Sequence, residues 1–325
     1  MCLLFVFGLF VYGAYRLYQH FYPTPDINPR DKYVLISGCD SGFGNGLAIE
    51  LDKQGFLVLA GVYSSANVDK LKSILSSNAT VFQLDITSQD DIDRAFELVS
   101  SKTKVLHALV NNAGIGASGM IDWITVDSMR QVMDINFFGH VAMTKTFLPL
   151  LIAKRDSRVV NICSVAGYIT KPGMSSYAAS KYAFESFSDC LRREMAVWNL
   201  RVSIIEPGFM RTNIMQGHDK ALRVLWETVP ESVKQRWGEA FLDKTVESVK
   251  NNIFMKYAED PAKVVRALKH AVMNTTPRIR YRPGIQSSCI MFAISRGPAW
   301  LADKLMIRPS LQGALPAGLR DQLAE

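Results

Sequence analysis

The chain has 325 residues, of which 48% are hydrophobic, and carries a formal net charge of +7. This length and composition allow one large core, so we expect one domain with terminal appendages. No block of Lys and Arg concentrates the charge, which argues against a nucleic-acid partner and indicates a solvated basic surface. The five cysteines contain no Cys-x-x-Cys pair and the five histidines show no triad or metal spacing. We therefore expect free thiols, no disulfide framework and no metal.

The beginning of the chain predicts a membrane anchor over residues 1–22. Residues 1–15 carry no charged side chain, and with some of the following aromatic residues at the interface the apolar length approaches the lower limit of about 17 residues for a spanning helix. A cleavable signal peptide is the alternative, but the basic n-region and the small residues before a cleavage site are missing. A hydrophobic helix packed on the domain is a further alternative. Arg16, Arg30 and Lys32 follow the anchor, so the positive-inside rule places the rest of the chain on the cytosolic side.

Residues 23–31 form a proline-rich linker, which we interpret as a stalk because each proline disfavours helix in the residue before it. From Tyr33 onward, short apolar runs alternate with helical patterns. The runs are apolar on both faces, as in a parallel sheet that helices cover on both sides. The predicted strands are Tyr33–Ser37, Phe56–Ala60, Thr80–Leu84, Val105–Val110, Arg158–Cys163 and Arg201–Ile205. The sequence therefore predicts a doubly wound α/β fold with a parallel sheet, of the Rossmann type, over residues 32–285.

The pattern changes after the sixth predicted strand. Residues 210–260 show helical spacing without an obvious strand, and we interpret them as a lid region. A helix over Pro261–Met273 and a last strand near Arg278–Arg282 would complete the sheet. Residues 286–325 form an apolar tail that charges and proline interrupt. Because such a tail is a poor spanning helix, we expect it to lie at a membrane interface or to pack on the domain.

A glycine-rich loop follows the first predicted strand. Its glycines fall as G-x-x-x-G-x-G, directly before a helical pattern that begins near Asn45. Glycine lets the backbone turn tightly and approach a pyrophosphate, which the free N–H groups and the dipole of the helix N-terminus attract. At this place in a βα pattern, the loop predicts a dinucleotide-binding site. The loop residues are Gly38, Cys39, Asp40, Ser41, Gly42, Phe43 and Gly44.

Tyr177 and Lys181 lie four residues apart, and Ser164 lies thirteen residues before the tyrosine. On a helix this spacing places the phenol and the ammonium on one face, where the cation can stabilise a phenolate. A tyrosine that ordinarily keeps its proton up to pH of about 10 can then exchange it with an alcohol or a ketone nearer neutrality. A single Tyr-x-x-x-Lys arises by chance in many chains, so the glycine loop is what makes this pattern persuasive.

Together these motifs resemble the short-chain dehydrogenase/reductase family. In chain order the matching positions between Ser37 and Thr212 are Gly38, Gly42, Gly44, Asp85, Asn111, Asn112, Ala113, Gly114, Asn136, Ser164, Tyr177, Lys181, Pro207, Gly208 and Thr212. The glycine loop and the segment Leu191-Arg192-Arg193-Glu194 further resemble the branch with retinol dehydrogenases, 17β-hydroxysteroid dehydrogenases and 3-hydroxybutyrate dehydrogenase. The resemblance implies an NAD(P)-dependent oxidoreductase acting on CH–OH donors. The implied cofactor-binding residues are Gly38, Asp40, Ser41, Gly42, Phe43, Gly44, Val62, Asp85, Asn112, Ala113, Gly114, Tyr177, Lys181, Pro207, Gly208 and Thr212.

The resemblance also implies roles for four catalytic residues. Tyr177 is the general acid/base, and Lys181 lowers the pKa of the tyrosine and contacts the nicotinamide ribose. Ser164 donates a hydrogen bond to the substrate oxygen, which offsets the charge that develops there. Asn136 binds a water that connects Lys181 to solvent.

The choice of cofactor depends on charge near the adenosine ribose. In this fold an acidic residue about 20 positions after the glycine loop binds the 2′-OH, and a nearby arginine accommodates a 2′-phosphate. The corresponding position is Val62, followed by Tyr63-Ser64-Ser65, so neither device is present. Asp40 brings a carboxylate into the glycine loop, where it repels a phosphate. We therefore predict NAD, with NADP as the alternative.

The substrate prediction depends on the region from Met210 to Tyr257, which offers apolar surface rather than charge pairs, although Arg211 is a candidate for binding a carboxylate. The apolar candidates are Met215, Leu222, Val224, Leu225, Trp226, Trp237, Phe241, Ile253, Phe254 and Met255. Such a lining suits a lipophilic alcohol, and a membrane anchor would bring the pocket to where such alcohols partition. We expect a retinoid, steroid or sterol as substrate, in lipid metabolism.

We expect the protein in a membrane, that of the endoplasmic reticulum, with the catalytic domain facing the cytosol. A short polar hydroxy acid, as in the 3-hydroxybutyrate enzymes, is the alternative substrate. A catalytically silent dinucleotide-binding membrane scaffold is the alternative from a different class, although a decayed site should have lost at least one of the four catalytic residues. A homodimer is an expectation from the resemblance alone.

Overall fold

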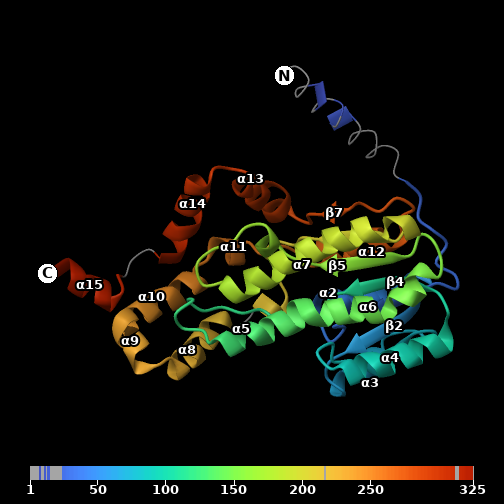
Figure 1. Ribbon diagram of the computed structural model, residues 1–325, viewed down its shortest axis with the longest axis horizontal. Coiled ribbons are helices and arrows are strands. Elements are labelled where there is room, and N and C mark those ends of the chain that lie inside the picture. The colour runs from blue at the N-terminus through green and yellow to red at the C-terminus, as the bar shows by residue number, and fades with distance from the viewer. Residues whose placement is uncertain are drawn as a thin grey trace.

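The sheet consists of parallel strands in the order β3-β2-β1-β4-β5-β6-β7 (Figure 1). The structure is a computed structural model that describes residues 24–215, 217–311 and 315–324, together with residues 7–8, 11 and 13–14. The strands are β1 (Tyr33–Ile36), β2 (Leu57–Val62), β3 (Thr80–Gln83), β4 (Leu106–Asn111), β5 (Arg158–Ile162), β6 (Arg201–Ile205) and β7 (Arg280–Tyr281). The predicted doubly wound α/β fold is confirmed, and each predicted strand is present.

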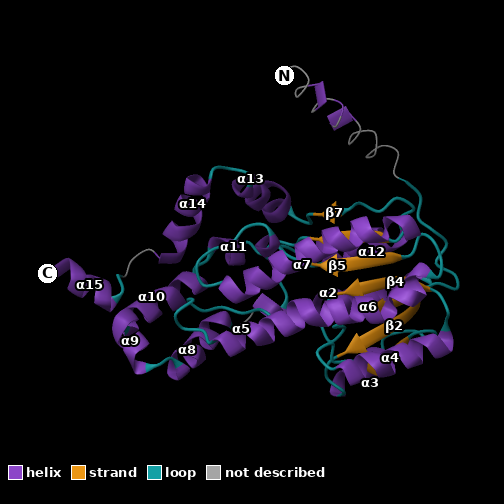
Figure 2. Ribbon diagram, in the orientation of Figure 1, coloured by secondary structure: helices purple, strands orange, loops and turns teal. Residues whose placement is uncertain are grey.

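Helices cover both faces of the sheet (Figure 2), as strands that are buried on both sides require. On one face lie α2 (Gly42–Gln54), α3 (Ala66–Lys72) and α12 (Ala262–Met273). On the other face lie α4 (Gln89–Lys102), α6 (Gly139–Ile152) and α7 (Ser175–Glu194). Each helix buries an apolar stripe against the strands, for example Leu47 and Leu51 of α2 and Phe147 of α6. The result is two apolar layers with the sheet between them.

The helical run Val126–Ile152 combines α5 (Val126–Met133), η1 (Asp134–Phe138) and α6. Among the described residues it is the one helix that is long and apolar enough to cross a membrane. Its α6 part packs into the core through Met143, Phe147 and Leu151, all fully buried. The run is therefore a core helix of the domain. The predicted anchor over residues 1–22 lies outside the described residues, except for positions 7–8, 11 and 13–14, which are helical.

The predicted stalk does not stand apart from the domain. Ile27 N donates to Met273 O at 2.8 Å, and Thr275 N donates to Pro25 O at 3.0 Å. The Asn274 amide joins the same contact, since its Nδ2 donates to Thr24 O at 2.7 Å. The interpretation of residues 23–31 as a free stalk is therefore wrong from Thr24 onward. Proline excludes helix there, but the extended backbone that it favours pairs well with the segment after α12.

The lid region is helical, as predicted. It contains η4 (Asn213–Met215), α8 (His218–Thr228), α9 (Glu231–Trp237), α10 (Glu239–Lys250) and α11 (Ile253–Lys256). These helices have their own small core around Trp123, whose ring lies 4.9 Å from that of Trp226, 5.8 Å from that of Trp237 and 6.1 Å from that of Phe241. Most of the aromatic residues expected to line a pocket therefore pack the lid helices instead.

The tail contains η5 (Gln286–Met291), α13 (Phe292–Ser295), α14 (Ala299–Leu311) and α15 (Ala317–Ala324). Its first part packs on the domain, because Gln286, Ser287 and Met291 are buried. Helix α14 differs, since none of its described side chains is buried and Trp300 is 66% exposed. Of the two interpretations of the tail, packing holds for η5, and α14 is left with an exposed apolar side.

Candidate active site

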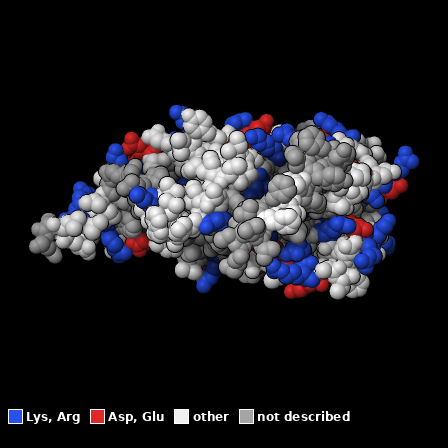
Figure 3. Space-filling view, turned by 90° about the horizontal axis from the view of Figure 1, so that it is seen from above, with Lys and Arg blue, Asp and Glu red and all other residues white. Residues whose placement is uncertain are grey.

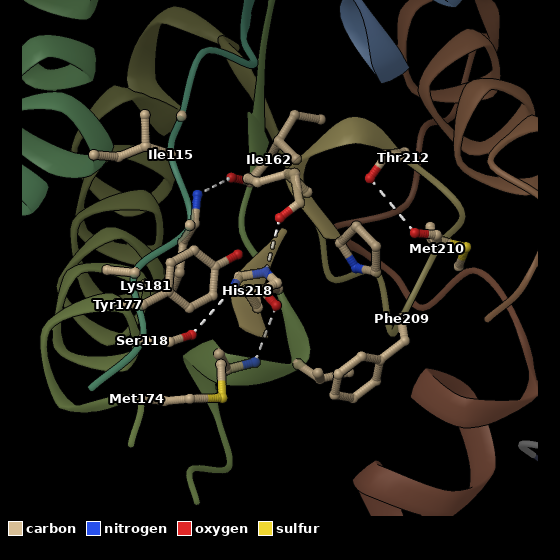
Figure 4. A pocket seen from close by; sticks show the side chains of 18 of the residues that line it. Ile115, Ser118, Ile162, Met174, Tyr177, Lys181, Phe209, Met210, Thr212 and His218 are labelled. Atoms are coloured by element: carbon tan, nitrogen blue, oxygen red, sulfur yellow. Dashed lines mark hydrogen bonds between the residues drawn. The ribbon is translucent and has the colours of Figure 1, made fainter. Parts of the chain in front are cut away.

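A cavity of about 810 Å³ opens at the carboxyl ends of the strands (Figure 4). Its walls come from the segments that follow β1, β4, β5 and β6, together with α7 and the lid helices. Strands β1 and β4 are neighbours although a crossover separates them in sequence, and this switch point is where open α/β sheets bind ligands. The volume lies within the range of about 300–1,000 Å³ that is usual for ligand sites.

Most of the predicted site residues line this cavity. The lining includes Gly38, Asp40, Ser41, Gly42, Phe43, Asp85, Asn112, Ala113, Gly114, Ser164, Tyr177, Lys181, Pro207, Gly208 and Thr212. Three predicted site residues are not among the residues that line the cavity. Gly44 and Asn136 support the wall from behind, and Val62 is fully buried in the core.

The glycine loop has the geometry that a dinucleotide needs. Gly38 has a φ of +70°, and a Cβ on it would come within 2.7 Å of the Cα of Ala113. At Gly44 a Cβ would lie 2.4 Å from Asn112 Nδ2. Gly42 has a φ of +65° and faces open space. The loop thus packs tightly on the β4 side and leaves its backbone bare toward the cavity, so that N–H groups at the start of α2 are accessible to a pyrophosphate.

The segment after β4 is fixed to the segment after β1. Asn112 Nδ2 donates to Ser37 O at 2.9 Å and to Gly38 O at 3.0 Å, and Ser37 Oγ accepts from Ala113 N at 3.2 Å. From behind, His140 Nε2 donates to Ala113 O at 2.8 Å. Burial lowers the pKa of His140 to about 3, so this ring is neutral. No pattern in the sequence indicated that His140 supports the segment after β4.

Asp40 does more than add charge to the glycine loop. Its carboxylate accepts hydrogen bonds from Tyr63 N at 2.7 Å, Ser64 N at 3.0 Å and Asn67 Nδ2 at 2.9 Å. It therefore lies at the end of β2, where the fold ordinarily has its ribose-binding acid. The Val62 side chain is buried in the sheet core, and the predicted contact of this residue with the cofactor stays a prediction.

Tyr177 and Lys181 share one face of α7, as predicted. Lys181 Nζ lies 5.8 Å from the centroid of the Tyr177 ring and donates to Ile162 O at 3.0 Å. Ser164 follows β5 and caps η2 (Val165–Gly167), where its Oγ accepts from Ala166 N at 3.2 Å. Figure 4 shows the Tyr177 and Lys181 side chains together in the cavity. Two of these side chains thus come from α7 and the third from the segment after β5, and all three line the cavity.

The electrostatics of Tyr177 differ from the prediction. Burial raises the pKa of the phenol above its ordinary value, and a hydrogen bond with Ser164 acts in the opposite direction. Burial lowers the pKa of Lys181. Ser164 therefore provides the contact that lowers the pKa of Tyr177, a role that the resemblance implied for Lys181.

Asn136 lies in η1, a π-helical turn between α5 and α6. The turn directs its side chain at the segment after β4, where Oδ1 accepts from Ile115 N at 2.9 Å and Nδ2 donates to Ile115 O at 3.0 Å. Nδ2 also donates to Ser180 Oγ at 3.2 Å. Asn136 thus connects the segment after β4, which forms part of the cavity wall, to α7, the helix that contains Tyr177 and Lys181. Its predicted role in binding a water stays a prediction.

Several lining residues had no signal in the sequence. Lys171 is half-buried in the wall, and its Nζ lies 5.9 Å from the centroid of the Phe209 ring. Burial lowers the pKa of this lysine, and no carboxylate is among the causes. Of the predicted apolar candidates, Leu222, Phe254 and Met255 line the cavity, and so do Met174, Met291 and Met306. Arg211 does not, since its Nη1 donates to Ala258 O at 2.6 Å.

Within the described residues no group of three His, Cys, Asp or Glu side chains is placed to bind a metal. The four cysteines in that part of the chain, Cys39, Cys163, Cys190 and Cys289, are free. Cys163 is buried beside Ser164, and burial raises the pKa of its thiol well above the ordinary value. It is therefore a core thiol rather than a nucleophile.

This site, at the switch point of a doubly wound sheet, is typical of a nicotinamide-dependent oxidoreductase. The profile of the short chain dehydrogenase family matches residues 32–223. The chain belongs to this family and is an NAD(P)-dependent short-chain dehydrogenase/reductase.

Similarity to particular proteins extends beyond the profile. The chain is 39% identical over 285 residues to retinol dehydrogenase 5 of Mus musculus, with 85% of this chain and 88% of the relative covered. It is 34% identical to dehydrogenase/reductase SDR family member 9 of Bos taurus, with 89% and 91% covered. Among solved structures, a short-chain dehydrogenase from Streptomyces avermitilis matches with a TM-score of 0.67 at 26% identity, over 81% of this chain and 91% of that one. A Burkholderia phymatum member in complex with NAD matches with a TM-score of 0.68 at 20% identity, over 89% and 100%.

The residues of the site fit a bound nicotinamide cofactor, because the glycine loop exposes backbone where its phosphates belong and Lys181 is buried at the other end. When bound, the nicotinamide supplies hydride transfer. In oxidation the Tyr177 phenolate would accept the hydroxyl proton. Ser164 would donate a hydrogen bond to the same oxygen and lower the cost of the charge on it. Lys181 brings a positive charge close to the phenolate, and Asn136 keeps the wall beside Lys181 in place.

Proposed function

We propose that this protein oxidises a lipophilic alcohol, a retinoid, steroid or sterol, with NAD as the cofactor, or reduces the corresponding carbonyl compound. The observation that carries the proposal is the composition of the cavity wall around Tyr177. Beyond the cofactor end, the wall is made of Met120, Met174, Leu222, Phe254, Met255, Met291 and Met306. A wall so rich in methionine fits a large, slightly flexible apolar molecule, since methionine adapts to irregular shapes.

The relatives support the same substrate class. One is named a retinol dehydrogenase, from Mus musculus, and a second retinol dehydrogenase, number 16 of Rattus norvegicus, is 35% identical over 85% of this chain and 88% of its own length. The preference for NAD rests on Asp40. Its carboxylate at the end of β2 would accept a hydrogen bond from a ribose hydroxyl and repel a 2′-phosphate.

A short hydroxy acid is the second candidate, and Lys171 favours it. Its ammonium belongs to the cavity wall, and the part of the chain that the structure describes pairs no carboxylate with it. A substrate carboxylate there would gain a charge-assisted hydrogen bond. The long apolar wall beyond Lys171 would then remain unused, which is why we rank this candidate second.

We further propose that the protein works at a membrane, that of the endoplasmic reticulum, with the catalytic domain in the cytosol. Residues 1–15 are uncharged, and α14 exposes Trp300, Leu305 and Ile307 next to the cavity residue Met306. Arg296 precedes α14 and Lys304 lies within it, and basic residues beside exposed apolar ones favour a lipid interface. Seen from the side of α13 and α14, much of the surface is uncharged (Figure 3).

The test is NADH formation by the full chain in vesicles, with retinol, a set of hydroxysteroids and 3-hydroxybutyrate as substrates. We expect turnover of at least one lipophilic alcohol and a much lower kcat/KM for 3-hydroxybutyrate. The variant Lys171→Met separates the two candidates, because it should lower turnover of the hydroxy acid and leave that of the lipophilic alcohol nearly unchanged. Turnover of 3-hydroxybutyrate alone, lost in Lys171→Met, would replace the first candidate by the second.

A further inference from the structure

Ser118 and His218 meet in the cavity wall, although they lie 100 residues apart in sequence. Ser118 belongs to the segment between β4 and α5, and His218 is the first residue of α8. Ser118 Oγ and His218 Nδ1 are 3.1 Å apart. Figure 4 shows this hydrogen bond, and Ser118, His218 and Tyr177 all line the cavity. The pair is therefore part of the site and not a surface contact.

The partners of the imidazole define its hydrogen positions. His218 Nε2 lies 2.9 Å from Ile214 O, which can only accept, so the ring proton belongs to Nε2. In the neutral ring Nδ1 then has a lone pair, and the Ser118 hydroxyl donates to it. The His218 side chain thus donates a hydrogen bond to Ile214 O in the lid region and accepts one from Ser118 in the segment after β4.

The segment around Gly116 faces the same contact. A Cβ on Gly116 would lie 3.4 Å from His218 Cε1 and 3.4 Å from Ile214 Cγ1, an ordinary van der Waals distance, so the imidazole and Ile214 lie close to this stretch of backbone. Gly119 N donates to Gly173 O at 3.0 Å, which fixes the segment just beyond Ser118. The beginning of α8 therefore rests on a wall that is itself held to the loop before the catalytic helix.

We propose that Ser118 and His218 are a positioning pair, which fixes the beginning of α8 against the segment after β4 and so sets the width of the substrate end of the cavity. The Trp123 cluster anchors the body of the lid helices, whereas this pair acts next to the reacting atoms. Ile214, His218 and Leu222 all line the cavity. When the pair is broken, the apolar wall loses its fixed distance from Tyr177, and a substrate that depends on a close fit binds less well.

The test compares variants that differ in one hydrogen-bonding atom. Ser118→Ala removes the donor. His218→Gln keeps a donor near the Nε2 position and loses the acceptor at Nδ1, whereas His218→Asn keeps an acceptor at the Nδ1 position. We expect faster amide hydrogen exchange in the first turn of α8, where Ala221 N donates to Gly217 O, by about 2- to 10-fold in Ser118→Ala and His218→Gln. His218→Asn should exchange more slowly than His218→Gln.

A second measurement, of the kinetics of alcohol oxidation, rests on the proposed function. For a lipophilic alcohol, KM should rise by about 2- to 10-fold in Ser118→Ala and in His218→Gln, with little change in kcat. The double variant Ser118→Ala/His218→Gln should have a KM no higher than that of either single variant, because both changes break the same hydrogen bond. Unchanged NADH affinity shows that each variant is folded. Absence of any turnover by the parent would count against the proposed function and leave the exchange measurement valid. Equal rates of amide hydrogen exchange in the first turn of α8 in the parent and in Ser118→Ala would overturn the proposal that the pair positions this helix.

Discussion

At Tyr177, burial and hydrogen bonding act in opposite directions on the pKa of the phenol. Burial disfavours the phenolate and raises the pKa, and the hydrogen bond with Ser164 lowers it. The nearby ammonium of Lys181 is itself buried, and its own pKa is lowered. Oxidation of an alcohol requires the phenolate, so the balance among these three side chains decides at which pH the enzyme becomes active.

Ser164→Ala therefore has a predicted pH signature. Loss of the hydrogen bond leaves burial unopposed, so the pKa of Tyr177 rises and the acid side of the kcat/KM profile for oxidation moves to higher pH. We also expect a fall in kcat of about 10²-fold or more, because the substrate oxygen loses a donor. Initial rates between pH 6 and 10 give the profile. A fall in rate with no movement of the profile would show that Ser164 contacts only the substrate.

Asp40 is the residue on which the proposed preference for NAD depends. In Asp40→Asn the charge is lost and only one of these two hydrogen bonds can persist, because Tyr63 N donates to Oδ2, Ser64 N donates to Oδ1 and an amide has one oxygen. We expect the ratio of kcat/KM for NAD to that for NADP to fall by about tenfold or more, since a unit charge a few Å from a phosphate contributes about 1–4 kcal/mol. Parallel titrations with both cofactors measure the ratio. A parent protein that prefers NADP would contradict this account of the ribose site.

At the scale of elements, a buried ion cluster joins α7 to β6 and β7. Arg280 Nη2 contacts Glu185 at 3.1 Å and Asp189 at 3.0 Å, both on α7, and its Nε contacts Glu206 at 3.0 Å. Arg282 Nε lies 2.6 Å from Glu206. Arg192 and Arg193 of α7 also contact Asp189, at 3.3 Å and 3.8 Å, so three carboxylates share four guanidinium groups. Glu206 precedes Pro207-Gly208 of the cofactor site, so the cluster connects the catalytic helix to that turn.

Glu206 gives this cluster a pH dependence. Burial and the repulsion from Glu185 raise the pKa of Glu206 from 4.5 to about 7. Between these pH values the folded chain keeps a proton on Glu206 that the unfolded chain has lost. The free energy of unfolding therefore falls as pH rises from 4.5 to 7, by at most about 1.4 kcal/mol per pH unit. In Glu206→Gln this part of the curve should flatten. Urea unfolding at a series of pH values measures it, and identical slopes in both proteins would exclude the effect.

Trp123 tests whether the lid helices are a separate packing unit. Its side chain is 2% exposed, and Trp→Ala at such a site costs about 3–5 kcal/mol. Because its partners belong to the lid helices, we expect Trp123→Ala to raise KM for the alcohol strongly and to leave the affinity for NADH close to that of the parent. Trp198→Ala is the control, since that ring is 49% exposed. Equal losses of NADH and alcohol binding would mean that the lid and the cofactor half unfold together.

The parts of this fold that were predictable are those whose signal is local. Strand β6 begins and ends where the apolar run does, and Tyr177 and Lys181 share a face because one helix contains both. Other features depend on partners far away in sequence. Asp40 reaches the end of β2 only in the folded sheet, and Ser118 finds His218 only when the lid is packed. The π-helical turn at Asn136 has no pattern of its own, because a wider turn is stabilised by what its side chains contact.

At the scale of the whole molecule, the architecture separates two tasks. The glycine loop, Asp40 and the turn after β6 form the cofactor end of the cavity on the rigid sheet. The lid helices and the tail form the apolar end, where α14 leaves Trp300 exposed. A cofactor can thus bind to a fixed surface while the substrate end varies with the sequence of the lid. This division explains how one family scaffold serves many alcohols.

The central claim is that Tyr177, Ser164 and Lys181 direct hydride transfer from a carbinol carbon to a nicotinamide in this cavity. Its most direct test uses a lipophilic alcohol with deuterium on the carbinol carbon and mass analysis of the reduced cofactor. We predict that the parent protein produces NADH carrying one deuterium and that Tyr177→Phe, measured at saturating NAD, produces about 10²-fold less or none. Equal deuterium transfer by the parent and by Tyr177→Phe would contradict the account.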